Sequence, residues 1–144
     1  MMVSINLPSV AEQQLILLEK GVELGCQQLR KNLDAPRYHA EPGFDTALHN
    51  EKHLRTQEEG WEPPSSEVIT AWFSQFKAVF PEYDSEKKLA SLLGLGGNNA
   101  GRRVRAYETG EEKIPYGIWR RFLVITGRVS QEIIPVMGIF IDDY

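Results

Sequence analysis

Hydrophobic residues recur along much of this chain at spacings of three and four, which is the pattern of helices that bury one face. The first run follows Ser9 and continues to about Leu33, and Ser9 with Glu12 three residues later has the form of a capping box. We therefore expect a first helix there. Its apolar positions form one narrow seam: Leu15, Leu18, Val22, Gly25 and Leu29.

Two interpretations of this seam stay open. It either pairs two subunits, with Gly25 permitting close approach of the two backbones, or packs on the chain's own core. Its two heptads are too few to establish a coiled coil, so the pattern alone favours neither interpretation.

The region from Asp34 to Pro64 interrupts the helical pattern. It is polar, contains four prolines, and has no sustained apolar period beyond a short helix expected around Thr46–Gln57. We interpret it as a connecting region. A second strong helix is then predicted from Pro64 and Ser65 up to Pro81, which stops it. The apolar stripe of this helix should form the core: Val68, Ile69, Trp72, Phe73, Phe76, Val79 and Phe80.

Two short helices are predicted next. Asp84 or Ser85 caps the first, and Gly94 supplies its C-terminal turn. A turn rich in glycine and asparagine follows over residues 95–100, and residues 101–108 form the second. The buried face of the first is expected to hold Leu89, Ala90, Leu92 and Leu93.

The remaining elements are also helical. Pro115 opens a helix that continues to about Thr126, and Ser130 starts a last short helix that breaks near Pro135. No strand pattern of any length appears, so we predict an all-α fold. Residues 1–64 would form an N-terminal helical arm with its polar connection, and residues 65–144 a helical domain.

The distribution of charge along the chain bears on the choice of partner more than the net charge does. The 144 residues carry a net charge of −4, which by itself argues against a nucleic-acid partner. From Ser85 to Arg128, however, nine Lys and Arg face four Glu, a local net charge of +5 that leaves −9 for the rest of the chain. Positive charge is thus concentrated in the segment of the short helices.

The second short helix carries the candidate chemistry. Helical spacing turns Val104 and Tyr107 inward and leaves the arginines pointing outward. Arginine presents a planar fork that bonds two acceptors of guanine or a phosphate, and asparagine can bond adenine. The candidate DNA-binding residues are Asn98, Asn99, Arg102, Arg103, Arg105, Lys87 and Lys88.

Two strings in this region resemble a known family. LASLLGL at 89–95 and VRAYETGEEKIP at 104–115 are similar to the helix-turn-helix of the Cro and phage-repressor (XRE) proteins. The resemblance covers roughly Trp72 to Ile134. It implies a compact bundle of about five helices, similar to lambda repressor, that binds double-stranded operator DNA as a homodimer. It places the base contacts at the start of the recognition helix, which corresponds here to Asn98–Arg105.

The sequence departs from this family at two points. The turn over 95–104 is about four residues longer than the usual connection, and Glu86 stands where these proteins often have a phosphate-binding glutamine. A carboxylate there is repelled by phosphate, which Lys87, Lys88 and Lys113 would offset. A long glycine-rich turn also resembles regulators of the antitoxin group, whose N-terminal portion binds a partner toxin.

The sequence gives little support for metal binding, nucleotide binding or catalysis. His49 and His53 are four apart, but no Glu follows the first histidine as a zinc peptidase requires, so we expect no metal site. The glycines at 94, 96 and 97 are not part of a nucleotide-binding loop, and we expect no cofactor and no enzymatic activity. The single cysteine, Cys26, is expected to be a small core or interface residue.

The sequence therefore predicts a sequence-specific regulator of transcription, with repression by occupancy of a promoter. No stretch is long and apolar enough for a membrane span, and we expect a cytoplasmic protein. The main alternative is a protein-interaction module, an antitoxin or an adaptor, whose acidic N-terminal region binds a basic partner protein. A metal-dependent hydrolase using the histidines and the acidic loop is the third possibility.

Overall fold

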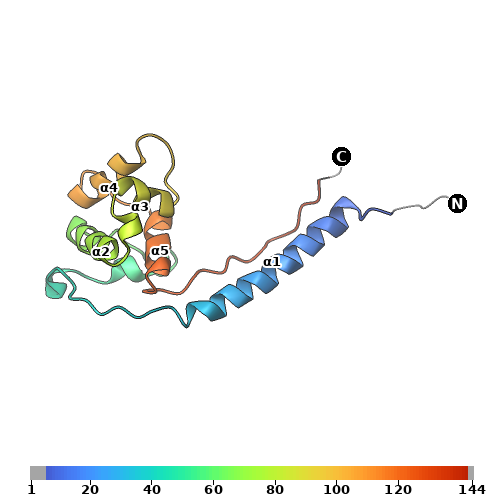
Figure 1. Cartoon of the computed structure of the whole chain (residues 1–144), viewed down its shortest axis with the longest axis horizontal. Helices are drawn as coiled ribbons and strands as arrows, with labels where there is room; N and C mark the ends of the chain where they lie inside the picture. The colour runs from blue at the N-terminus through green and yellow to red at the C-terminus, as the bar shows by residue number, and fades with distance from the viewer. Residues whose placement is uncertain (1–5, 143–144) are drawn as a thin grey trace. The chain divides into compact units, whose positions relative to one another are not determined.

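The computed structural model describes residues 6–142, and every regular element in that part of the chain is a helix, which confirms the predicted all-α class (Figure 1). Two compact units are present: residues 40–132 form one, which we call the bundle, and the described residues on either side, 6–39 and 133–142, form the other, which we call the terminal unit. The α-helices are α1 (Val10–Asn32), α2 (Ser66–Val79), α3 (Glu86–Leu92), α4 (Ala100–Thr109) and α5 (Tyr116–Ile125), and the 3-10 turns are η1 (Thr46–Leu48), η2 (Lys52–Leu54) and η3 (Pro81–Tyr83).

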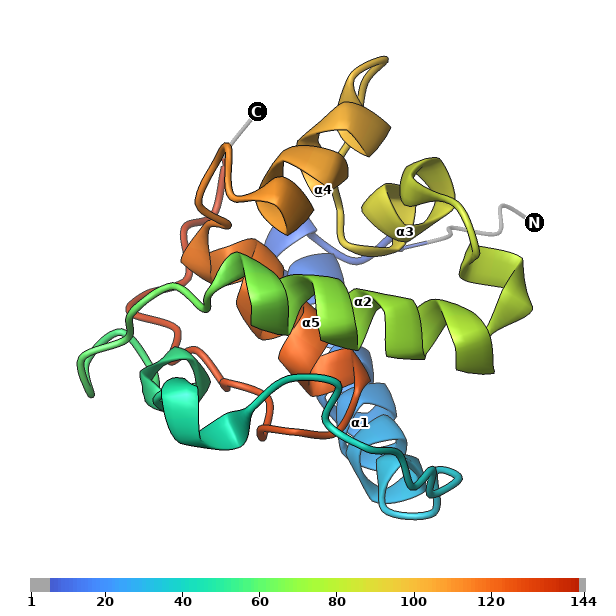
Figure 2. The same ribbon diagram turned by 90° about the vertical axis from the view of Figure 1, so that its left-hand side faces the viewer.

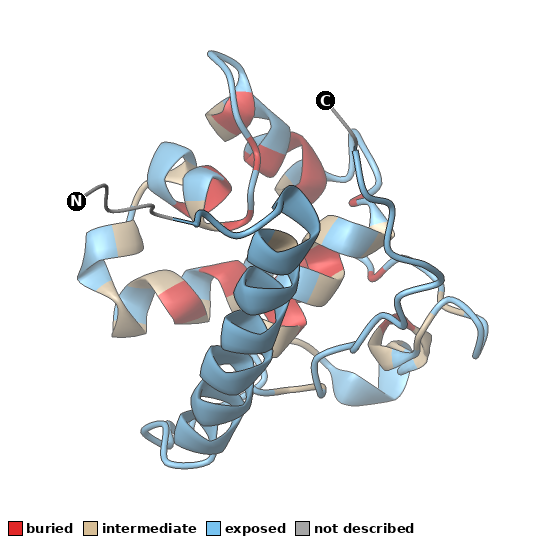
Figure 3. Ribbon diagram, turned by 90° about the vertical axis from the view of Figure 1, so that its right-hand side faces the viewer, coloured by how far each residue is buried: buried red, intermediate tan, exposed pale blue. Residues whose placement is uncertain are grey.

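Helix α1 begins where the capping box predicts. The Ser9 side chain accepts a hydrogen bond from the Glu12 backbone N–H, and the Glu12 carboxylate accepts one from the Ser9 N–H. None of its residues is buried, as Figure 3 shows. Within the terminal unit, four side chains of the seam, Leu15, Leu18, Val22 and Leu29, are 41–67% exposed, and both interpretations of the seam stay open. Cys26 is also exposed.

The end of the chain differs from the prediction. Residues 130–142 contain no helix, although Ser130 was expected to start one. Pro135 lacks a backbone N–H and disfavours the helical conformation in the residue before it, which explains why no helix forms. Among the described residues, no helix has both the length and the apolar character that a membrane span needs.

The core of the bundle lies between α2 and the later helices. Ser65 caps α2 by accepting a hydrogen bond from the Val68 N–H, and Val68, Ile69, Phe73 and Phe76 are buried as predicted. Trp119 of α5 is fully buried and stacks on the Trp72 ring at 5.8 Å. The other fully buried side chains come from α3, α4, α5 and the segment before α5: Leu89, Leu93, Val104, Tyr107, Ile114, Phe122 and Leu123.

The predicted connecting region is partly folded into the bundle. The helix expected around Thr46–Gln57 is replaced by η1 and η2, because Asp45 and Asn50 side chains accept hydrogen bonds from backbone N–H groups two residues later. His53 is buried, and Phe44, Leu54 and Trp61 pack against the core. The compact unit therefore begins near Ala40, which differs from the sequence-based boundary after residue 64.

His53 joins the irregular segment before α2 to the core of the bundle. The Trp119 indole N–H donates to His53 Nδ1 at 3.2 Å, and the Trp61 indole N–H donates to the His53 carbonyl at 3.0 Å. Burial of the imidazole, together with the positive charge of Arg128 and the neighbouring His49, lowers its pKa to about 4. His53 is therefore neutral at pH 7 and acts as an acceptor.

This pKa predicts a stability change with pH. His53 binds a proton below pH 6.5 in the unfolded chain but only near pH 4 in the folded one. Its contribution to the free energy of unfolding is therefore complete above pH 6.5 and is lost as the pH falls from 6.5 to about 4. We expect the loss to approach about 3 kcal/mol in the free energy of unfolding. His53→Asn keeps an acceptor for Trp119 without titrating, so urea unfolding at pH 6.5 and 4.5 should show a smaller pH dependence in this variant. His39→Asn, at an exposed histidine, serves as the control, and identical pH dependence in all three proteins would contradict the assignment.

Candidate nucleic-acid interface

Helices α3 and α4 are a pair joined by a seven-residue connection over 93–99 (Figure 2). Ser85 caps α3 by accepting a hydrogen bond from the Lys88 N–H. Gly94 then takes a left-handed conformation with φ +85°, and the Leu95 N–H donates to the Ala90 carbonyl. The helix end thus follows the prediction, and α4 begins at Ala100 after the glycine-rich turn.

The first turns of the two helices lie against each other. A Cβ atom added to Gly101 would lie 3.4 Å from the backbone nitrogen of Lys87 and 3.6 Å from its Cα. These are van der Waals distances, so the start of α4 packs directly on the start of α3. This packing brings the lysines that begin α3 into the neighbourhood of the arginines that begin α4.

A lysine of α2 holds this pair in place. Lys77 Nζ lies 3.8 Å from Glu86 Oε1 of α3 and 3.7 Å from Glu108 Oε1 of α4. Burial raises the pKa of Glu108, which Lys77 opposes, and the Thr70 hydroxyl donates to the Glu108 carbonyl at 2.9 Å. Glu86, the residue expected to repel phosphate, is thus half-buried beside a cation, which reduces that repulsion.

All seven predicted site residues are exposed: Lys87, Lys88, Asn98, Asn99, Arg102, Arg103 and Arg105. Val104 and Tyr107 point the other way and are buried, as helical spacing predicted. Within residues 6–142 the Arg102 side chain makes no hydrogen bond or ion pair, and the Arg105 side chain interacts only through its charge with Glu108. The Arg102 guanidinium is therefore available to a ligand.

Two of the candidate side chains, Arg103 and Lys88, have local contacts. Arg103 donates to the Tyr107 hydroxyl at 3.4 Å, which is a long hydrogen bond. Lys88 Nζ lies 3.7 Å from Asp84 Oδ1 in an exposed pair, which contributes little to stability. Asn99 occupies the N-cap position of α4 but its side chain makes no capping hydrogen bond, so it does not satisfy the first N–H groups of the helix.

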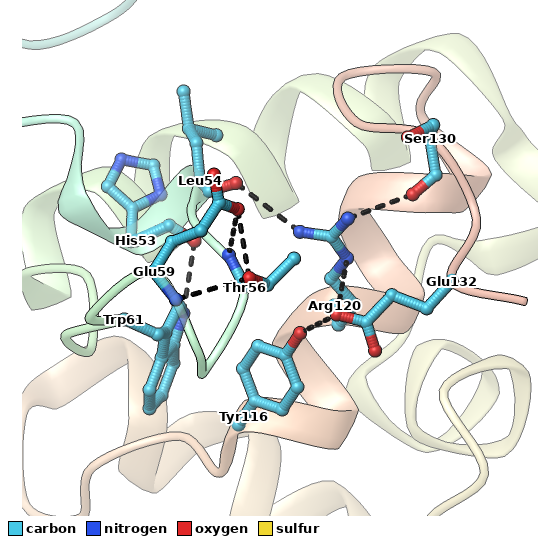
Figure 4. Close-up of polar contacts among 9 residues, drawn as sticks. All are labelled: His53, Leu54, Thr56, Glu59, Trp61, Tyr116, Arg120, Ser130 and Glu132. Atoms are coloured by element: carbon cyan, nitrogen blue, oxygen red, sulfur yellow. Dashed lines mark hydrogen bonds and ion pairs between the residues drawn. The ribbon is translucent and has the colours of Figure 1, made fainter. Parts of the chain in front are cut away.

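Two further basic residues, Arg120 and Arg121 of α5, make contacts that stabilise the fold. Figure 4 shows the Arg120 guanidinium donating to the carbonyls of Leu54 and Ser130, and its Nε lies 3.8 Å from Glu132. Arg121 donates to the carbonyl of Leu92 at 2.8 Å. Helical spacing gave no signal for these roles because the acceptors come from distant parts of the chain.

Arg128 is another structural cation that the sequence did not single out. Its guanidinium lies 3.9 Å from the centre of the Trp72 ring, and it donates to Gln75 Oε1 at 2.7 Å. Burial lowers its pKa. Besides Lys113, which lies between α4 and α5, the basic side chains of residues 85–128 that are not held by these contacts lie on α3 and α4.

Comparison of the chain with known protein families, with curated proteins and with solved structures finds no match in any of the three.

The histidines do not gather into a metal centre. His49 Nδ1 lies 3.0 Å from the Ser65 hydroxyl, its Nε2 lies 3.2 Å from Glu67, and His53 is turned to Trp119. Within the described part of the chain, no three side chains of metal-ligating type come together. The histidines instead secure the start of α2 and the packing of α5.

The turn between α3 and α4 generates a prediction. Gly94→Ala should lower the free energy of unfolding by about 1 kcal/mol, because an L side chain is strained at the left-handed φ of this position. Gly96→Ala is the matched control, since Gly96 lies in open space and has no positive φ. Chemical denaturation of both variants measures the difference, and an equal change at the two positions would contradict this account of the turn.

Proposed function

We propose that this protein binds double-stranded DNA through α3 and α4 and acts as a sequence-specific, homodimeric regulator of transcription. The observation that carries the proposal is the outer face of α4, where exposed Arg102, Arg103 and Arg105 lie opposite a buried apolar face. Exposed Lys87 and Lys88 begin the helix packed against it.

The dimensions of α4 suit the major groove. Its ten residues extend about 15 Å, and the groove is about 12 Å wide, so one such helix fits with its side chains against the base edges. Arg102 stands in the first turn, where a recognition helix makes its base contacts. A bidentate guanidinium bonds O6 and N7 of guanine, whereas Asn98 and Asn99 have the amide groups that pair with adenine.

Phosphate contacts would supply much of the affinity. Lys87 and Lys88 lie where a supporting helix meets the DNA backbone, and cations there release bound counterions when they neutralise phosphates. Lys77 holds Glu86 and Glu108 on the inner side of the pair, which limits their opposition to this positive surface. Binding should therefore weaken steeply as salt concentration rises.

A protein-binding module is the second candidate function. The chain outside Ser85–Arg128 has a net charge of −9, which is suited to a basic partner protein such as a toxin. In that function the arginines of α4 would be a solvated helix face. Binding of the purified chain to DNA alone distinguishes the two functions.

We expect selection from random double-stranded fragments to enrich a palindromic motif, and the Arg102→Ala, Arg103→Ala double variant to lose at least about tenfold in affinity for it. The reason is that each lost bidentate base contact weakens discrimination by about 1–3 kcal/mol. Fluorescence anisotropy at two salt concentrations measures both the affinity and its salt dependence.

The control is the Arg37→Ala, Arg55→Ala double variant, which removes two exposed arginines outside α3 and α4. It should bind the selected motif like the wild type. Absence of any enriched motif at either salt concentration would overturn the proposal and favour the protein-binding module.

A further inference from the structure

Exposed apolar side chains are gathered in the terminal unit. Of the 20 exposed large hydrophobic residues in the described part of the chain, 18 belong to residues 6–39 and 133–142, whereas the bundle has Leu48 and Ile125. No described residue of the terminal unit is buried, and Figure 3 shows α1 almost entirely in the colour of exposed residues. A patch of this kind marks a protein interface, because water contact with so much apolar surface is unfavourable.

We infer that a second copy of this chain covers the surface, with α1 of the two copies packed antiparallel along the Leu15, Leu18, Val22, Gly25 and Leu29 seam. A two-fold dimer requires a surface that is complementary to itself. The seam meets this condition because its residues recur at the spacing at which two helices interlock. Gly25 leaves open space beside α1, with no atom within 4 Å of an added Cβ.

The charges on α1 favour the antiparallel orientation. Glu12, Glu19 and Glu23 lie with Lys20 in its first two-thirds, a net charge of −2, whereas Arg30 and Lys31 occupy its last turn. Antiparallel pairing places the acidic end of one helix beside the basic end of the other, whereas parallel pairing places like charges together. The helix dipoles have the same preference.

The C-terminal segment enlarges the same surface. Gln14 of α1 donates to the Phe140 carbonyl at 3.2 Å, and the segment runs beside α1 within the terminal unit (Figure 1). Its described residues, 133–142, add apolar side chains to the exposed surface of the terminal unit. The exposed apolar side chains of this segment are Ile133, Ile134, Val136, Met137, Ile139, Phe140 and Ile141.

This dimer would join two copies of the bundle, and the step from it to a two-fold DNA site rests on the proposed function. The dimer itself does not need DNA. Light scattering of the full chain without DNA should therefore give twice the chain mass of 16.4 kDa. Val22→Glu, which places a charge in the centre of the seam, should give the monomer mass at the same concentration.

Leu48→Glu is the matched control, since Leu48 is an exposed apolar residue of the bundle. It should remain a dimer. Trp61, Trp72 and Trp119 all lie in the bundle, so their fluorescence reports whether it stays folded in each variant. A monomeric wild type, a dimeric Val22→Glu or a larger assembly would overturn the inference.

Crosslinking tests the orientation. In a Cys26→Ser background, Leu15→Cys and Leu29→Cys chains with tags of different size are mixed and treated with a short bis-maleimide. Antiparallel helices bring position 15 of one copy near position 29 of the other, whereas in a parallel pair about 21 Å separates them. The mixed crosslink is expected, and crosslinks only between identical chains would overturn the antiparallel arrangement.

The outcomes separate this inference from the proposed function. The Arg102→Ala, Arg103→Ala variant should remain a dimer although it loses DNA binding. Val22→Glu should still bind one half-site but lose the tighter binding to a palindrome. A dimer that does not bind DNA would support the interface and contradict the proposed function. A monomer that binds DNA would contradict the interface and leave only the DNA-binding part of the proposed function.

Discussion

Burial of the Trp119 indole constrains the rest of the bundle. An indole N–H removed from water needs an acceptor, and a lost partner costs about 1–3 kcal/mol, so the core must bring His53 to it. This requirement folds an irregular segment against α5, 66 residues away in sequence. The same ring stacks on Trp72 of α2 and on Phe122. One side chain thus fixes α2, α5 and the preceding segment relative to one another.

Lys77 of α2 fixes the positions of α3 and α4, as Trp119 fixes that of α5. Its ammonium group lies between Glu86 and Glu108 and is itself largely buried, so solvent screens these contacts less than it screens exposed pairs. With the acidic groups turned toward α2, the arginines of α4 face solvent. Because Lys77 pairs with the acidic groups while the arginines of α4 remain exposed, a chain of net negative charge can present a positive surface on α4.

Sequence reasoning located the helices of the bundle closely because their boundaries have local causes. Ser65 and Ser85 cap α2 and α3, Gly94 ends α3, and Pro115 precedes α5. The burial of His53 has no such local cause, since its partner is distant and its segment has no apolar period. Arg120 and Arg102 also look alike in sequence. They differ only in the folded chain, where two backbone carbonyls accept hydrogen bonds from Arg120 and none accepts one from the Arg102 side chain.

Helices α1 and α2 show why an apolar pattern predicts a face but not its partner. Both have hydrophobic residues at helical spacing and a serine N-cap, yet α2 buries four side chains and α1 buries none. The difference is that α2 meets the aromatic residues of α5 within its own unit. Most of the stability of a helix in a protein comes from packing of its apolar face, so α1 depends on whatever covers its seam. If that cover is a second copy, folding of the terminal unit becomes concentration-dependent while the bundle remains stable by itself.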